Sequence, residues 1–272
     1  MRTRPRVVAH RGASSVEAEH TLAAYRRALD DGADGLECDV RLTRDGVLVC
    51  VHDRRVDRTS SGRGVVSTLE LADLDELDFG SWRRGNPDDL PDPLLTASWE
   101  APDRDRTSVL TLARLLEMVS SVDRPVQLAI ETKHPTRYAG LVESTLVELL
   151  TQHDLVGRKN ANGQVQVRVM SFAATGLRRI RALAPTLPTV HLMKRVPLRH
   201  RDGTIAVGGS IAGPSLEALR ALPSYVARAH AHGHEVHVWT VDEIDDVDYV
   251  TGLGVDVIIT NRPDRVLQHL GG

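Results

Sequence analysis

Short segments rich in β-branched residues alternate with helical patterns along almost the whole chain. The segments that we expect to form strands are Val7–Ala9, Gly35–Val40, Val126–Glu131, Val165–Ser171, Thr189–Met193, a weaker segment near Thr204–Ser210, Glu235–Thr240 and Val255–Thr260. Apolar residues at three- and four-residue spacing predict helices at Thr21–Asp31, Leu112–Ser120, Ala139–Gln152, Thr175–Leu183, Ser215–His232 and Glu243–Leu253. Strands that alternate with helices in this way pair in parallel.

About eight such units in 272 residues favour a closed TIM barrel over an open doubly wound sheet. No Gly-x-Gly-x-x-Gly loop, which is typical of dinucleotide-binding folds, follows any of the expected strands. The predicted fold class is therefore α/β, a TIM (β/α)8 barrel, in a single catalytic domain that spans residues 1–272.

One expected strand does not fit this alternation. Val47–Val51 follows the second strand after only four residues, 43–46, which is too short for a parallel crossover but suits an antiparallel hairpin. A two-residue turn at Asp45-Gly46 or at Arg44-Asp45 gives two alternative pairing registers.

The register of this hairpin decides which side chains share a face. One register places His52 opposite Asp39, and the other places it opposite Glu37. Both predict that His52 lies on the face of the two carboxylates. Both also predict that Cys38 and Cys50 point to opposite faces, which makes a disulfide between them a poor candidate.

The alternation stops between Arg54 and Thr107. This stretch is rich in charged and turn residues and contains four prolines and two of the three tryptophans, Trp82 and Trp99. An unstructured connection of this length is unusual inside a compact domain. We therefore expect residues 54–107 to form a small inserted subdomain after the second-strand hairpin, capping the end of the barrel where loops follow strands.

Composition narrows the classes of partner. Only 3% of the residues are aromatic and the formal net charge is −3, so a surface that binds nucleic acid is not expected. No run of about 18 apolar residues exists that could span a bilayer. The basic segment Met1–Arg6 precedes too short an apolar stretch for a signal peptide, so we expect a cytoplasmic protein, monomeric or homodimeric, without integral membrane association.

The polar residues at the carboxyl ends of the expected strands are the candidates for chemistry, because aliphatic side chains fill the rest of a TIM barrel. They are His10, Arg11, Glu37, Asp39, His52, Asp53, Glu131 and Lys133. The spacing of Glu37 and Asp39 projects both carboxylates to one side of a strand. With Glu131 they form an all-oxygen set that suits one hard divalent cation, Mg²⁺ or Ca²⁺. The alternative is that these carboxylates only form ion pairs with Arg11, Lys133 or Arg41.

His10 and His52 form a second group at the same strand ends. Two imidazoles beside one metal ion can divide the work, with one accepting a proton and the other donating one, although a single histidine is more often structural. Arg11 and Lys133 can both bind an anionic oxygen. Lys133 is one of only three lysines in the chain. Together these residues indicate phosphoryl chemistry.

These motifs resemble, in order and spacing, those of the glycerophosphodiester phosphodiesterase family. The matching segments are Val8–Gly12, Glu19–Thr21, Gly35–Val40, Val51–Asp53 with Asp57–Thr59, Ile130–Lys133, Val238–Val241 and Ile259–Pro263. The resemblance implies a metal-dependent TIM-barrel hydrolase that splits glycerophosphodiesters into an alcohol and sn-glycerol 3-phosphate. It implies catalytic roles for His10 and His52, metal ligation by Glu37, Asp39 and Glu131, and phosphate binding by Arg11 and Lys133. The matching tryptophan, Trp239, lines the glycerol side of the pocket in this reading, or packs in the core.

The chain departs from the family at one position. The family usually has Glu-Asn-Thr where this sequence has Glu19-His20-Thr21, so an imidazole replaces the amide that orders the loop before the first helix. Thr21 can still cap that helix. We expect Glu19 near the metal ion or Arg11, and both Glu19 and Asp53 in supporting roles.

Three alternative functions can each be distinguished from hydrolysis of glycerophosphodiesters by one feature. A lysophospholipase D with the same site needs an apolar groove, which the insertion could supply. A catalytically silent phosphate-binding barrel would have lost a histidine or a carboxylate, and none is lost. An aldolase or isomerase would use Lys133 as a Schiff-base amine, which borohydride trapping detects. The sequence leaves open the leaving alcohol, the preferred ion and which histidine is the acid.

Overall fold

Parallel strands at the centre and helices around them form the fold in the computed structural model, which describes residues 4–83, 103–134, 140–156, 165–206 and 209–271. The strands are β1 (Arg6–His10), β2 (Gly35–Leu42), β3 (Leu48–Cys50), β4 (Val126–Thr132), β5 (Val165–Ser171), β6 (Thr189–Met193), β7 (Ile211–Pro214), β8 (His237–Val238) and β9 (Val257–Thr260). The α-helices are α1 (Leu22–Asp30), α2 (Leu71–Asp75), α3 (Arg104–Thr107), α4 (Leu112–Ser120), α5 (Leu141–Gln152), α6 (Ala174–Leu183), α7 (Leu216–Ala221), α8 (Tyr225–Ala231), α9 (Ile244–Leu253) and α10 (Pro263–Leu270).

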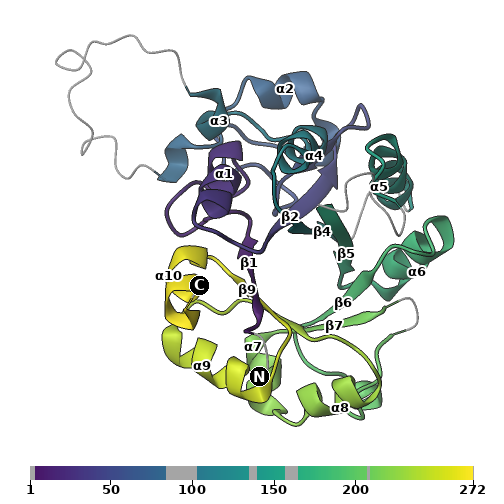
Figure 1. Cartoon of the computed structure of the whole chain (residues 1–272). Helices are drawn as coiled ribbons and strands as arrows, with labels where there is room; N and C mark the ends of the chain where they lie inside the picture. The colour runs from purple at the N-terminus through teal and green to yellow at the C-terminus, as the bar shows by residue number, and fades with distance from the viewer. Residues whose placement is uncertain (1–3, 84–102, 135–139, 157–164, 207–208, 272) are drawn as a thin grey trace.

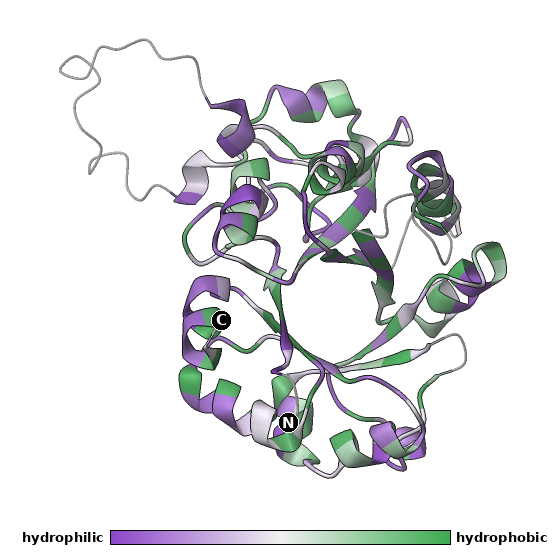
Figure 2. Cartoon of the chain, viewed as in Figure 1, coloured by the Kyte–Doolittle hydropathy of each residue, from purple (hydrophilic) through white to green (hydrophobic). Residues whose placement is uncertain are grey.

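The strand order is that of a barrel. All strands except β3 pair in parallel in the order β7-β6-β5-β4-β2-β1-β9-β8. Parallel bridges between Ala212 and Val236 and between Ser215 and Trp239 join the two ends of this order. Figure 1 shows the helices outside this ring of strands, and in Figure 2 hydrophobic and hydrophilic residues alternate around them, as helices that bury one face require. The predicted TIM barrel is confirmed.

Two predicted elements differ in the structure. The weak sixth strand is not at 204–210 but at Ile211–Pro214, where Gly213 approaches β6 so closely that a Cβ would lie 2.9 Å from Val190. The single helix predicted over Ser215–His232 is two helices, α7 and α8, because Pro223 cannot continue a helix. The last helix, α10, is not among those that the pattern predicts.

The hairpin has neither of the two predicted registers. Val40 pairs with Cys50, and the backbone N–H of Thr43 donates to the carbonyl of Val47, so the turn has three residues rather than two. Gly46 makes this turn possible because its φ is +86°, in the left-handed region that glycine tolerates.

The correct register changes which side chains share a face. Cys38 and Cys50 lie on the same side of the hairpin and are both buried in one core cluster as free thiols, contrary to the prediction. His52 follows the end of β3, where the chain has left the ladder, and the guanidinium of Arg41 donates two hydrogen bonds to its carbonyl. His52 therefore reaches the site through this loop and not through strand pairing.

Part of the insertion has its own apolar contacts. Val56, Val66, Leu74 and Phe79 are buried against the hairpin. Residues 84–102 of the predicted cap, with Trp99, lie outside the described residues. None of the helices in the described ranges is both long and apolar enough to cross a membrane.

Gly35 lies where β2 approaches β4 too closely to leave space for a side chain. A Cβ at this position would lie 2.5 Å from the carbonyl oxygen of Gln127 on β4. We expect Gly35→Ala to lower the free energy of unfolding by about 1–3 kcal/mol because the two strands must separate. Gly252→Ala is the control, since its Cβ would meet nothing within 4 Å, and we expect it to change stability by less than about 1 kcal/mol. Urea denaturation measures both, and equal stabilities would contradict the expectation.

Candidate active site

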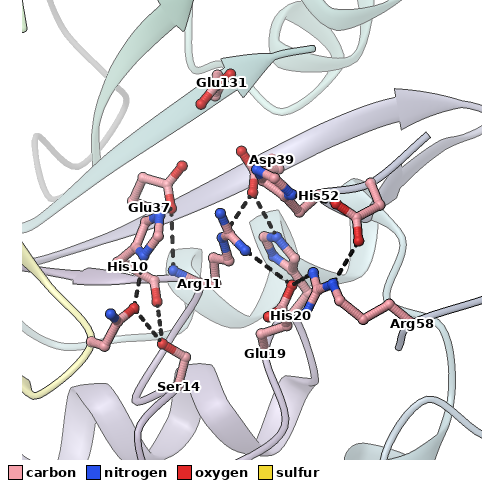
Figure 3. Close-up of polar contacts among 12 residues, drawn as sticks. His10, Arg11, Ser14, Glu19, His20, Glu37, Asp39, His52, Arg58 and Glu131 are labelled. Atoms are coloured by element: carbon pink, nitrogen blue, oxygen red, sulfur yellow. Dashed lines mark hydrogen bonds and ion pairs between the residues drawn. The ribbon is translucent and has the colours of Figure 1, made fainter. Parts of the chain in front are cut away.

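A pocket of about 640 Å³ opens at the carboxyl ends of the barrel strands. Of the residues predicted from the sequence, it is lined by His10, Arg11, Glu37, His52, Asp53, Glu131, Lys133 and Trp239. Asp39 and Glu19 lie behind this lining, and both contact Arg11. The structure thus brings the predicted residues together at one mouth, and Figure 3 shows most of them.

Three buried carboxylates lie at the centre of the site. Glu37, Asp39 and Glu131 each offer an oxygen within 4.8 Å of the others. Burial and the charge of Asp39 raise the pKa of Glu37 well above its usual value and raise the pKa of Glu131 to about 7. This mutual repulsion in an all-oxygen set is what a bound divalent cation relieves, so the three residues fit the predicted metal.

Two cations already contact these carboxylates. Lys133 Nζ lies 2.8 Å from both Asp39 Oδ1 and Glu131 Oε1, and Arg11 Nε lies 3.1 Å from Asp39 Oδ2. The ion-pair alternative is therefore partly realised. Burial opposes ionisation of Asp39, but its contacts with His20, Lys133 and Arg11 lower its pKa well below the usual value. Arg11 has a φ of +59°, an unfavourable conformation of the kind that clusters at functional sites.

A chain of hydrogen bonds orients His10. The amide nitrogen of Asn261 donates to Asp242 Oδ2 (2.7 Å), so its Oδ1 faces His10 and accepts from Nδ1 (2.7 Å). The second ring nitrogen, Nε2, is then the unprotonated one and lies 3.9 Å from Glu37 Oε2. Burial, with the charge of Arg11, lowers the pKa of His10 to about 4, so the ring is neutral at pH 7. Ser14 also donates to Asn261 Oδ1.

A carboxylate orients His52. Its Nδ1 lies 2.7 Å from Asp53 Oδ1 and donates to it, which leaves Nε2 for the pocket. Burial lowers the pKa of His52, against the attraction of Asp39. Arg58 binds Asp53 (2.6 Å) and also Glu19 (2.7 Å), and Glu19 binds Arg11 (3.1 Å). Through these contacts one charged network connects His52 to Arg11. Figure 3 shows the part of it formed by Arg58, Glu19 and Arg11.

Sequence reasoning missed four supporting residues. They are Tyr25, Arg58, Asp242 and Asn261. Arg58 and Asn261 do lie inside motifs that the sequence singled out, Asp57–Thr59 and Ile259–Pro263. Arg58 also binds Glu19, 39 residues away, and Asn261 binds His10, 251 residues away, so only the fold shows these contacts.

His20 occupies the position where the chain departs from its resembled family. It is buried, has a φ of +63°, and donates from Nε2 to Asp39 Oδ2 at 3.0 Å. Its Nδ1 lies 2.8 Å from the Tyr25 hydroxyl, which donates to the carbonyl of Glu37. The imidazole thus fixes the orientation of one carboxylate of the candidate metal site.

We expect His20→Phe to raise the concentration of Mg²⁺ or Ca²⁺ needed for half-maximal activity by about 10- to 100-fold, because Asp39 loses the donor that orients it. His20→Asn, which introduces the residue usual in the family and keeps a donor, should stay within a few-fold of the wild type. Titration of activity with each cation measures both variants. An unchanged requirement in His20→Phe would show that this contact has no part in cation binding.

The sequence predicts that Trp239 either lines the pocket or packs in the core, and in the structure it does both. It lines the pocket, contacts Phe172 edge-on with ring centroids 5.4 Å apart, and donates from Nε1 to the carbonyl of Gly213. It also packs against the apolar cluster in the barrel interior.

Comparison with known proteins gives three concordant results. The model of the Glycerophosphoryl diester phosphodiesterase family matches residues 10–265. The "Probable glycerophosphodiester phosphodiesterase 1" of Mycobacterium tuberculosis is 49% identical over 96% of this chain and 90% of its own length. The glycerophosphodiester phosphodiesterase of Bacillus subtilis is 33% identical over 94% of this chain and 83% of its own.

Solved structures agree on the fold. A phosphodiesterase from Oleispira antarctica, in complex with the product sn-glycerol-3-phosphate, matches 99% of this chain and 98% of its own with a TM-score of 0.79. Its sequence identity is 21%, so this likeness concerns the fold.

Proposed function

The chain belongs to the glycerophosphoryl diester phosphodiesterase family, and we propose that it hydrolyses small glycerophosphodiesters to an alcohol and sn-glycerol 3-phosphate with one divalent cation, Mg²⁺ or Ca²⁺. Membership makes the chain a phosphoric diester hydrolase. The observation that carries the finer proposal is one pocket in which two oriented imidazoles and two cationic side chains lie beside a cluster of three buried carboxylates.

Glu37, Asp39 and Glu131 would hold the cation. Bound there, it would supply positive charge to a phosphate oxygen and lower the pKa of an attacking hydroxyl. Arg11 and Lys133 would bind the nonbridging phosphate oxygens, because both cationic side chains line the pocket.

His10 and His52 would move the protons. One removes the proton from the attacking hydroxyl, which is that of water or the glycerol 2-hydroxyl of the substrate. The other donates a proton to the oxygen of the departing alcohol. In both residues Nδ1 is already bound, to Asn261 and to Asp53, so the same nitrogen, Nε2, is available for transfer.

The insertion at 54–107 would cap this pocket. Arg58 contacts Glu19 and Asp53 beside the site, and Arg83 donates to the carbonyls of Ser14 and Ser15 in the loop after β1. These contacts support a position of the described part of the insertion against the mouth of the barrel.

Hydrolysis of lysophospholipids is the second candidate. Met170, Phe172, Leu192, Trp239 and Ile259 give the pocket an apolar wall, which could take part of an acyl chain.

A paired assay distinguishes the two candidates. We expect the purified protein with Mg²⁺ or Ca²⁺ to release choline from glycerophosphocholine with a kcat/KM at least about tenfold above that for lysophosphatidylcholine. The opposite ranking would replace the first proposal with the second.

A further inference from the structure

A third histidine lines the pocket without a part in the reaction proposed above. His134 follows Lys133 at the end of β4. Its Nε2 lies 3.2 Å from Oε1 of Glu143 on α5. Helices α5 and α6 lie side by side outside β4 and β5, so this contact joins the pocket to the helical layer behind it (Figure 1).

Glu143 is an unusual partner because its side chain is fully buried. A carboxylate removed from water is destabilising unless cations or donors compensate it. Arg179 supplies a cation, with Nη1 3.4 Å from Oε1 of Glu143, and the ring nitrogen Nε2 of His134 lies 3.2 Å from the same oxygen. Burial opposes ionisation of Glu143, but the contact with His134 and the charge of Arg179 lower its pKa overall. Glu143 is therefore an anion that can hold the His134 ring in place.

Gly176 leaves space for this contact. A Cβ at position 176 would lie 2.9 Å from Glu143 Oε1 and 2.9 Å from His134 Nε2. Gly176 lies inside α6, where glycine is a poor helix former. Any larger residue would push the imidazole and the carboxylate apart, so three elements of the fold converge on the placement of one pocket side chain.

We propose that His134 binds a hydroxyl group on the organic part of the substrate and that Glu143 is its positioning residue. This rests on the proposed function. The phosphate oxygens have Arg11 and Lys133 as partners, whereas the neighbouring wall, with Met170 and Phe172, is apolar. His134 supplies a hydrogen-bonding group between these two regions. The hydroxyl belongs either to glycerol or to the leaving alcohol, and the same chemistry serves both.

The test uses three phosphate monoesters as competitive inhibitors of diester hydrolysis. Glycerol 3-phosphate carries the hydroxyls of glycerol, inositol 1-phosphate carries those of an alcohol leaving group, and methyl phosphate carries none. We expect His134→Ala to weaken one of the two hydroxyl-bearing inhibitors about tenfold, as the loss of one hydrogen bond predicts, and to leave methyl phosphate within about twofold. The inhibitor that weakens identifies the source of the hydroxyl.

Substrate kinetics give a second readout. In His134→Ala the KM for the diester should rise about tenfold while kcat stays within about threefold, because the lost contact binds the substrate before and during reaction. Equal weakening of all three inhibitors, or no weakening of any, would overturn the proposal. So would a loss confined to kcat.

Two further variants test the positioning role of Glu143. Glu143→Gln and Gly176→Ala should each reproduce the inhibitor pattern of His134→Ala, the first by removing the charge and the second by displacing the ring. Arg179→Gln is the matched control, because it changes the other side chain that contacts Glu143 without changing the pocket lining. If Arg179→Gln gives the same pattern, or Glu143→Gln gives none, Glu143 does not position His134.

Failure of this inference differs from failure of the proposed function. If the wild type hydrolyses a glycerophosphodiester and His134→Ala behaves identically, only the inference fails. If the wild type releases no alcohol from any diester, the proposed function fails. Direct titration of the three monoesters into the wild type and into His134→Ala still compares their binding and so still tests the role of His134.

Discussion

Replacement of either pocket histidine, His10→Ala or His52→Ala, is expected to lower kcat at least about 100-fold. Each change removes an imidazole whose Nδ1 is fixed by a partner and whose Nε2 is left for proton transfer. Steady-state kinetics on glycerophosphocholine measures the loss. Thermal unfolding should change little for His52, which is a third exposed, and full activity in either variant would refute its role.

A second substrate separates the acid from the base. Bis(p-nitrophenyl) phosphate has a leaving group that departs without protonation, so the variant that lacks the general acid should recover most of its activity on it. The variant that lacks the base should not. Recovery in both variants, or in neither, would contradict a division of labour between the two histidines.

Asp39→Asn is expected to have an effect of similar size. Asp39 carries the most strongly stabilised negative charge of the three carboxylates, because His20, Arg11 and Lys133 all contact it. Its neutralisation should lower activity at least about 100-fold at a fixed cation concentration, since a hard cation prefers charged oxygen ligands. Chelation of the wild type with EDTA should abolish activity, and Mg²⁺ or Ca²⁺ should restore it.

The control for this variant is Asp31→Asn, which neutralises a carboxylate that pairs with Arg27 on α1, away from the pocket. Its activity should stay within about twofold of the wild type. Unchanged cation dependence in Asp39→Asn would exclude Asp39 as a ligand.

The strands were predictable where residue type and burial agree. Val165–Ser171 and Thr189–Met193 are short segments rich in β-branched and other apolar residues, and the structure has them with the same bounds. Ile211–Pro214 was missed because a strand that ends in glycine and proline has no such pattern and is held by its contact with β6. The hairpin register depended on whether the turn has two or three residues, which the conformation of Gly46 decides.

The grouping of the candidate site residues was predictable, because polar residues at the carboxyl ends of TIM-barrel strands converge on one mouth. The supporting residues that contact and orient them were not predictable. His20 replaces an asparagine yet reaches Asp39, and Asn261 fixes the tautomer of His10 through Asp242. These contacts join residues 19 to 251 positions apart, and no local pattern encodes them. The resemblance of the motifs to the family is confirmed by the family match over residues 10–265.

The proposed hydrolysis is tested most directly by ³¹P NMR of glycerophosphocholine incubated with the purified protein and Mg²⁺ or Ca²⁺, with an EDTA sample beside it. We expect the diester signal to be replaced by that of sn-glycerol 3-phosphate alone, and only where the cation is present. Appearance of phosphocholine, conversion that survives EDTA, or no conversion with either cation would contradict it.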